Sequence, residues 1–156
     1  MKVEIGEYED TKKRNINVRI DEFDTWNMDI TLAYIIHPML IQLKDTKHGA
    51  PFVEGSDVPL GMEMSEEALV GYKERGETDA LFFTRWEWVL NEMIWAFGEI
   101  QKDSWESKYY GPLIKDENHP LGSRFEWVKH EDMKAHQNRI SNGFRLFGKY
   151  YQDLWD

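Results

Sequence analysis

The clearest pattern in the chain is a set of three long segments in which apolar residues recur every three or four positions. This spacing is typical of amphipathic helices, because 3.6 residues complete one turn. The segments cover residues 27–48, 79–102 and 132–155. Pro38 falls inside the first segment and predicts a kink, because proline has no backbone N–H to donate. We therefore expect three main helices.

Shorter patterns of another period precede these helices. Apolar and polar residues alternate around Val3–Ile5 and again over Ile16–Ile20, as in half-buried strands. Residues 1–21 therefore predict a β-hairpin that turns near residues 10–13. Because an isolated hairpin is marginally stable in water, its apolar face should pack on the helices or pair with another chain.

The connecting segments complete the predicted fold. Ser65 and Gly76 are good start and stop signals for a short helix between the first two long ones. Residues 103–129 contain two Pro and two Gly without a sustained period, and predict loops with at most a short turn of helix. The expected fold is mainly α (α+β). It is a bundle of three main helices plus a short helix, with an N-terminal β-hairpin, in a single domain spanning residues 1–156.

The helix expected at residues 79–102 is apolar around much of its circumference, which places it at the centre of the bundle or at a subunit contact. Besides its main apolar stripe it carries a second seam, at Leu81, Trp88 and Trp95. One domain of this size can cover one seam and leave the other for a partner subunit. We therefore expect a homo-oligomer, with a dimer as the commonest form.

Composition and charge narrow the functional classes. The chain has no cysteine, so it offers no disulfide framework, thiolate metal site or cysteine nucleophile. A net charge of −10 disfavours binding to nucleic acid, because affinity for a phosphate backbone comes from cations. No apolar leader or membrane-length run is present, so we expect no membrane association and a cytoplasmic location.

One candidate metal site lies on the first long helix. Asp29, His37 and His48 lie on roughly one side of it and could bind a metal or pair as a base and its orienting group. This spacing is not a recognised ligand pattern, and a solvated flank with charges at the helix end explains it at least as well. The metal hypothesis depends on these three residues converging.

Charged residues on the central helix allow two interpretations. Arg85 and Glu92 are seven positions apart and share a face, so burial would require that at least one of them is paired. Glu92 and Glu99 could together serve a metal, as carboxylates in helical bundles do. Because the Glu-x-x-His motif of that class is absent, a structural ion pair is the favoured interpretation.

The last helix carries the main candidate for ligand binding. Guanidinium and ammonium groups beside aromatic rings suit a planar or phosphorylated small molecule. The candidate ligand-binding residues are Arg139, Asn142, Arg145, Lys149 and Tyr150. A solvated amphipathic helix carries the same residue types. His119, His130 and His136 come from separate elements and are interpreted as independent surface or cap residues.

Two stretches resemble a known group of proteins. The first contains Asp24-Thr-Trp-Asn-Met-Asp and continues to Lys47-His-Gly-Ala-Pro, and the second runs from Asn142-Gly to Phe147-Gly-Lys-Tyr-Tyr. Together they resemble a family of small uncharacterised proteins encoded by tailed bacteriophages, with the combined pattern Trp-x-Met-Asp, Lys-His-Gly-x-Pro and Leu-Phe-Gly-Lys-Tyr-Tyr. The resemblance implies a place in the infected bacterial cytoplasm or in the virion.

These observations lead to three functional hypotheses. Recognised catalytic signatures are absent, so we expect a non-enzymatic binding protein with no catalytic residue and no cofactor. It would act during infection by sequestering a nucleotide-like signal of host defence or by blocking a host protein. The alternatives are a metal-dependent phosphoester hydrolase and a minor virion or assembly component whose hairpin pairs with neighbouring subunits.

Overall fold

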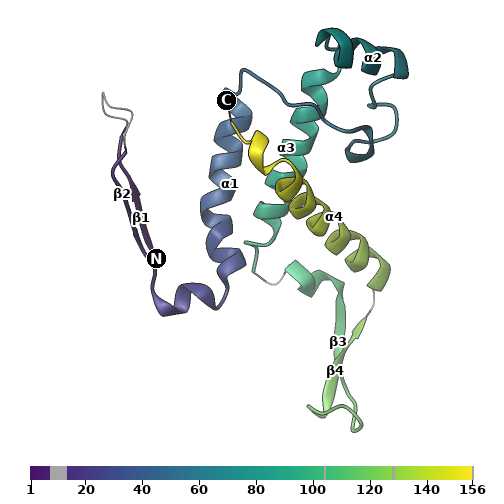
Figure 1. Cartoon of the computed structure of the whole chain (residues 1–156). Coiled ribbons are helices and arrows are strands. Elements are labelled where there is room, and N and C mark those ends of the chain that lie inside the picture. Colours follow the sequence, from purple (N-terminus) through teal and green to yellow (C-terminus); the bar gives the residue numbers. More distant parts are fainter. Residues whose placement is uncertain (8–13, 104, 128, 156) are drawn as a thin grey trace.

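The computed structural model describes residues 1–7, 14–103, 105–127 and 129–155. Within these residues the chain is mainly helical with a few short antiparallel strands, which confirms the expected fold class (Figure 1). The helices are α1 (Met28–Thr46), α2 (Glu66–Arg75), α3 (Phe82–Glu99) and α4 (His130–Lys149). Short 3-10 turns lie before, between and after them: η1 (Glu22–Thr25), η2 (Gly55–Asp57), η3 (Trp105–Tyr109) and η4 (Tyr151–Asp153). None of the helices in these ranges is long and apolar enough to cross a membrane.

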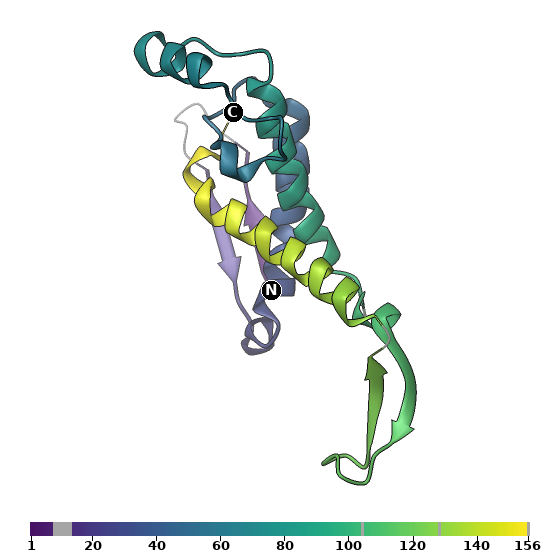
Figure 2. The ribbon, with the colours of Figure 1, turned by 90° about the vertical axis from the view of Figure 1, so that its right-hand side faces the viewer.

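Two antiparallel hairpins lie outside the bundle (Figures 1 and 2). The first consists of β1 (Lys2–Ile5) and β2 (Ile16–Arg19) and confirms the predicted N-terminal hairpin; its predicted turn at residues 10–13 lies outside the described residues. The second consists of β3 (Tyr110–Lys115) and β4 (Ser123–Trp127), in the segment for which we expected loops. That expectation was wrong because a register irregularity between Tyr110 and Leu113 breaks the alternation by which a strand is recognised.

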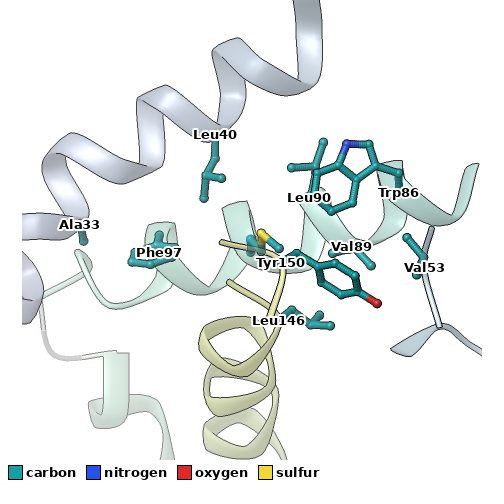
Figure 3. Packing of buried hydrophobic residues seen from close by; sticks show 10 residues of the cluster. Ala33, Leu40, Val53, Trp86, Val89, Leu90, Phe97, Leu146 and Tyr150 are labelled. Carbon is teal, nitrogen blue, oxygen red and sulfur yellow. The ribbon is translucent and has the colours of Figure 1, made fainter. Parts of the chain in front are cut away.

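Helix α3 occupies the centre, with α1 and α4 packed against it (Figure 1). Its predicted main stripe is buried, and side chains from α1, the α1–α2 loop and α4 converge on it (Figure 3). The fully buried side chains of this core include Ala33, Trp86, Val89, Leu90, Met93 and Leu146. The short helix α2 begins and ends as expected, because Ser65 accepts a hydrogen bond from the Ala68 amide and Gly76 adopts φ 70°.

The contact between α3 and α4 is close because of Gly143. A Cβ at this position would lie 2.3 Å from the Ala96 Cβ and 2.8 Å from the Glu92 carbonyl oxygen. A glycine in a helix interior costs about 1 kcal/mol relative to alanine, so its presence here reflects the approach of another backbone. Gly148 has no atom within 4 Å of such a Cβ, so the same explanation does not hold for it.

Two helix faces differ from the simple sequence pattern. In α1 the apolar residues divide, with Ala33 and Leu40 buried against α3 and Met39 exposed. In α4 and the turn that follows it, Leu146 and Tyr150 are buried, whereas Phe144 and Tyr151 are exposed. Tyr150, expected to bind a ligand, therefore belongs to the core.

Candidate functional site

The predicted ligand residues of α4 face two different parts of the molecule. Arg139 reaches α3, where its guanidinium donates to both carboxylate oxygens of Glu92 at 3.0 and 2.7 Å. The same guanidinium lies 3.9 Å from the centre of a Trp95 ring. The hydrogen bonds to Glu92 raise the pKa of Arg139. The Arg139 guanidinium thus already has an acidic and an aromatic partner in the chain. A phosphorylated ligand would have to replace these partners or share the guanidinium with them.

The other four predicted ligand residues gather at a buried carboxylate in the loop between α1 and α2. The side chain of Asp57 is 1% exposed, and Arg145 lies 2.7 Å from its Oδ1. Its Oδ2 accepts hydrogen bonds from the Tyr150 hydroxyl at 2.7 Å and from the Lys149 ammonium at 2.5 Å. Asn142 contributes indirectly, because its Oδ1 accepts two hydrogen bonds from Arg145, at 3.0 and 2.9 Å.

The charges at Asp57 stabilise one another. Burial favours the neutral carboxyl, but hydrogen bonds from Lys149, Tyr150 and Arg145 outweigh it and lower the pKa of Asp57. Burial, together with the hydrogen bond to Asp57, raises the pKa of Tyr150 to about 12, so its hydroxyl remains a donor at neutral pH. The pKa of Lys149 is raised despite burial, because Asp57 and Glu54 both favour the ammonium. This cluster ties the loop to the end of α4.

Ligand binding by Arg139, Asn142, Arg145, Lys149 and Tyr150 stays a prediction, and the structure defines what it would require. Each of these cations already contacts a carboxylate of the same chain. The side chains of Arg139 and Arg145 are 49% and 48% exposed, so an incoming phosphate would have to share them with Glu92 and Asp57. Displacing either carboxylate would leave a buried anion without its partners, which is costly. These pairs could not be read from the spacing along α4, because their partners come from other elements.

The three predicted metal ligands do not converge. Asp29 is exposed in the first turn of α1, and His48 lies beyond the end of that helix. His37 packs against Gly98 of α3, where an added Cβ would lie 2.9 Å from its Nε2. In the part of the chain that the structure describes, no three His, Asp or Glu side chains are close enough to hold a metal ion.

The charged residues on α3 form structural ion pairs, as favoured from the sequence. Arg85 is buried, bonded to the Asp79 carboxylate and, at 2.9 Å, to the Met62 carbonyl oxygen. Glu92 pairs with Arg139, and the buried Glu99 lies near three cationic or titratable side chains. The contacts of Glu99 are Lys102 at 2.5 Å, His136 at 3.1 Å and Lys108 at 3.7 Å.

His136 lies in a cluster of rings, which the interpretation as an independent surface residue missed. Its imidazole stacks on Trp105 with centroids 4.8 Å apart, and meets Trp95 and Tyr109 edge-on at 5.1 and 5.7 Å. A usable signal existed in the sequence, because His136 falls on the apolar side of the last predicted helix. The cluster joins η3 (Trp105–Tyr109), from which β3 begins, to α3 and α4.

The environment of His136 favours its neutral form. Burial lowers the pKa of the imidazole, the Lys108 ammonium lowers it further, and the Glu99 carboxylate opposes both. Although Nε2 is 3.1 Å from the Glu99 Oε1, the two groups are not aligned for a hydrogen bond. The neutral ring packs between aromatic side chains. Through these contacts it holds η3, and the β3–β4 hairpin that follows it, in position.

The β3–β4 hairpin projects from this cluster as an arm (Figure 2). Leu113 pairs with Phe125 across the strands, so both point to the same side, and both side chains are more than half exposed. Tyr110 stacks on Phe125 with centroids 5.3 Å apart. The arm therefore presents apolar surface to solvent while its base is packed.

The tip of the arm is held by hydrogen bonds. Asp116 accepts from the Arg124 guanidinium at 2.8 Å and from the Asn118 amide at 3.1 Å. The amide of Leu121 donates to His119 Nδ1 at 3.3 Å, while the Leu121 side chain is 82% exposed. An ordered turn thus presents one large aliphatic side chain to the solvent.

Comparison with known proteins finds no match among family models, curated proteins or solved structures. The chemistry of the candidate sites is therefore inferred from their contacts. On α4 the predicted ligand-binding cations are satisfied by partners within the chain. On the β3–β4 arm apolar groups at Leu113, Leu121 and Phe125 remain uncovered.

Proposed function

We propose that this chain is a non-enzymatic binding protein that recognises another protein through the β3–β4 arm. The observation that carries the proposal is an arm with a packed base, a hydrogen-bonded tip and exposed apolar side chains. A preorganised element of this kind loses little conformational entropy on binding. Leu113, Leu121 and Phe125 would be its apolar anchors, and the free edges of the two strands offer backbone hydrogen bonds to a partner strand.

The contacts on α4 favour a protein partner over a nucleotide-like signal. A nucleotide needs cations that are available to its phosphates, whereas Arg139, Arg145 and Lys149 are engaged with Glu92 and Asp57. A protein partner at the arm needs no displacement of these ion pairs. The resemblance to tailed-phage proteins implies a place in the infected bacterial cytoplasm or in the virion. We therefore propose that the partner is a host protein and that binding blocks it.

A photo-reactive amino acid at position 121 tests this proposal in infected cells. We expect one discrete cross-linked host protein that is absent when the same group stands at Glu67, an exposed position on α2. The purified host protein should bind the native chain, and Leu121→Glu should weaken this binding at least tenfold. Asn118→Glu, which adds the same charge to the same turn, should change it less than threefold.

Two outcomes would count against the proposal. No specific cross-link at position 121, or equal effects of Leu121→Glu and Asn118→Glu, would remove the arm as the recognition element. A rise in melting temperature with a cyclic nucleotide would favour the small-molecule alternative instead, since only a ligand bound by the native state raises it.

A second candidate function, an assembly or minor virion component, is favoured by the N-terminal hairpin. Every residue of β1 and β2 is exposed, so the hairpin is open to pairing with a neighbouring subunit. Mass spectrometry of purified particles tests this candidate. We expect the chain at a constant copy number per particle if it is a component, and its absence from washed particles would exclude that role.

A further inference from the structure

The N-terminal hairpin has one apolar face. Val3 pairs with Val18 and Ile5 pairs with Ile16, and cross-strand partners point to the same side of a two-stranded sheet. We call this surface the hairpin face; it consists of Val3, Ile5, Ile16, Val18 and Ile20. All five side chains are exposed, Ile16 at 61%. This face was expected to pack on the helices or to pair with another chain, and among the described residues of one copy its side chains remain exposed.

Helix α1 has a second apolar surface that flanks its buried face, and most of the side chains on it are exposed. We call it the helix stripe; it consists of the exposed Met28, Leu32 and Met39 and the half-buried Ile35. Steps of four, three and four residues place these side chains in one row along the helix. Met28 and Met39 are 55% and 63% exposed. Between the two surfaces, the connecting residues Phe23 and Trp26 are 63% and 79% exposed.

Together these surfaces are large for a monomer. Taking about 200 Å² for a whole aromatic side chain and about 100 Å² for an aliphatic one, their exposed fractions amount to roughly 700 Å². The largest single apolar patch on an ordinary monomer is roughly 300–600 Å², whereas this area is divided over two surfaces and the turn between them. A standard protein interface takes about 800 Å² from each partner. The exposed apolar surface of the N-terminal third is thus close to what one side of a stable interface needs.

The two surfaces also match in length. Four strand steps from Ile16 to Ile20 span about 14 Å at 3.4 Å per residue. Eleven helix steps from Met28 to Met39 span about 16 Å at 1.5 Å per residue. Within one chain they do not cover each other, and the connecting turn η1 (Glu22–Thr25) is fixed by the Asp24 carboxylate, which accepts from the Asp21 amide at 2.8 Å.

We propose that a second copy of this chain covers both surfaces, in a dimer in which the hairpin face of each copy packs on the helix stripe of the other. The exchange is reciprocal, so it closes with two-fold symmetry and leaves neither surface free for further addition. Each hairpin then gains the apolar support that a two-stranded sheet needs in water. The proposal concerns a different surface from the β3–β4 arm and does not depend on the arm's partner.

Light scattering of the purified chain tests the stoichiometry. We expect a mass of about twice 18.6 kDa at micromolar concentration. Ile16→Glu, which places a charge on the hairpin face, should weaken the dimer at least 100-fold without changing the far-ultraviolet circular dichroism. Asn17→Glu adds the same charge to the opposite face of the same strand and should leave the dimer intact. A native monomer, an open-ended polymer or equal effects of the two variants would overturn the proposal.

Disulfide trapping tests the reciprocal packing. The chain has no cysteine, so only introduced thiols can pair. When Val18→Cys and Leu32→Cys chains are mixed and mildly oxidised, we expect a covalent dimer that forms at least tenfold more than in either chain alone. Asn17→Cys mixed with Leu32→Cys is the matched control and should form little. Strong cross-linking of Val18→Cys chains to each other would overturn the reciprocal arrangement, because it would place hairpin against hairpin.

Discussion

Helices α1 and α4 pack on the same central helix, and a β-hairpin precedes each of them. The α1 side and the α4 side differ in how many of their charged and apolar side chains are matched by other groups of the chain. On the α4 side, Gly143 allows close backbone contact, cations pair with Glu92 and Asp57, and a ring cluster fixes the base of the hairpin. On the α1 side every residue of the two hairpin strands is exposed, and the helix carries an apolar row that is mostly exposed.

The difference indicates whether the side chains of each half are matched within the chain or by another molecule. Groups on α4 are matched by groups within the chain, so changes there should act on folding stability. Apolar groups on the outer side of α1 have no match in the described parts of one copy, so changes there should act on association.

Asp57→Asn should have the largest effect. It removes the negative charge that Arg145 and Lys149 surround, and we expect the free energy of unfolding to fall by about 3 kcal/mol. Urea denaturation followed by circular dichroism measures it. The control is Glu54→Gln, because Glu54 also pairs with Lys149 but its side chain is 59% exposed; we expect a loss of about 0.5 kcal/mol or less. Equal losses would show that burial does not distinguish the two pairs.

Gly143→Ala should destabilise the chain by about 1–3 kcal/mol. The added methyl group would clash with Ala96 and the Glu92 carbonyl, and forcing the helices apart outweighs the better helix propensity of alanine. Gly148→Ala is the matched control on the same helix. With no atom nearby, it should stabilise the chain by up to about 1 kcal/mol. Stabilisation by both changes would contradict the close packing of α3 on α4.

The ring cluster predicts a dependence of stability on pH. The pKa of His136 is lowered in the folded chain, so below its ordinary value of 6.5 the unfolded chain binds more protons. The contribution of His136 to the free energy of unfolding is therefore fully present above pH 6.5. It is lost as the pH falls from 6.5 to the pKa of His136 in the folded chain. His136→Phe keeps a ring in the cluster but removes the titration, and its stability should be flatter over that interval. Identical profiles, measured by urea denaturation at each pH, would argue against a neutral His136.

Changes on the outer side of α1 should have the smallest effect on stability. In the monomeric Ile16→Glu background, we expect Met39→Gln to alter the free energy of unfolding by less than about 0.5 kcal/mol, because Met39 is already mostly exposed. Urea denaturation at low protein concentration measures this. A loss above 1 kcal/mol would mean that the helix stripe is covered within one chain, and the contrast between the two halves would disappear.

Much of the fold was predictable because it depends on local periodicity. The three long helices, the short helix between Ser65 and Gly76 and the N-terminal hairpin follow from spacing and end signals that the chain carries locally. The β3–β4 hairpin was missed because an irregular register removes the alternation on which strand prediction rests. The candidate sites were less predictable, since Asp57 and Lys149 are 92 positions apart and meet only in three dimensions.

Local sequence patterns were enough to specify helices α1 to α4 and the N-terminal hairpin, because hydrophobic period and capping act between residues a few positions apart. Tertiary structure alone decided which side of α1 is buried, since apolar residues lie on more than one of its faces and only the packing of Ala33 and Leu40 against α3 selects between them. It also decided that the cations of α4 meet carboxylates of the same chain. Long-range pairing depends on where the folded backbone brings each group, and no local pattern encodes that position.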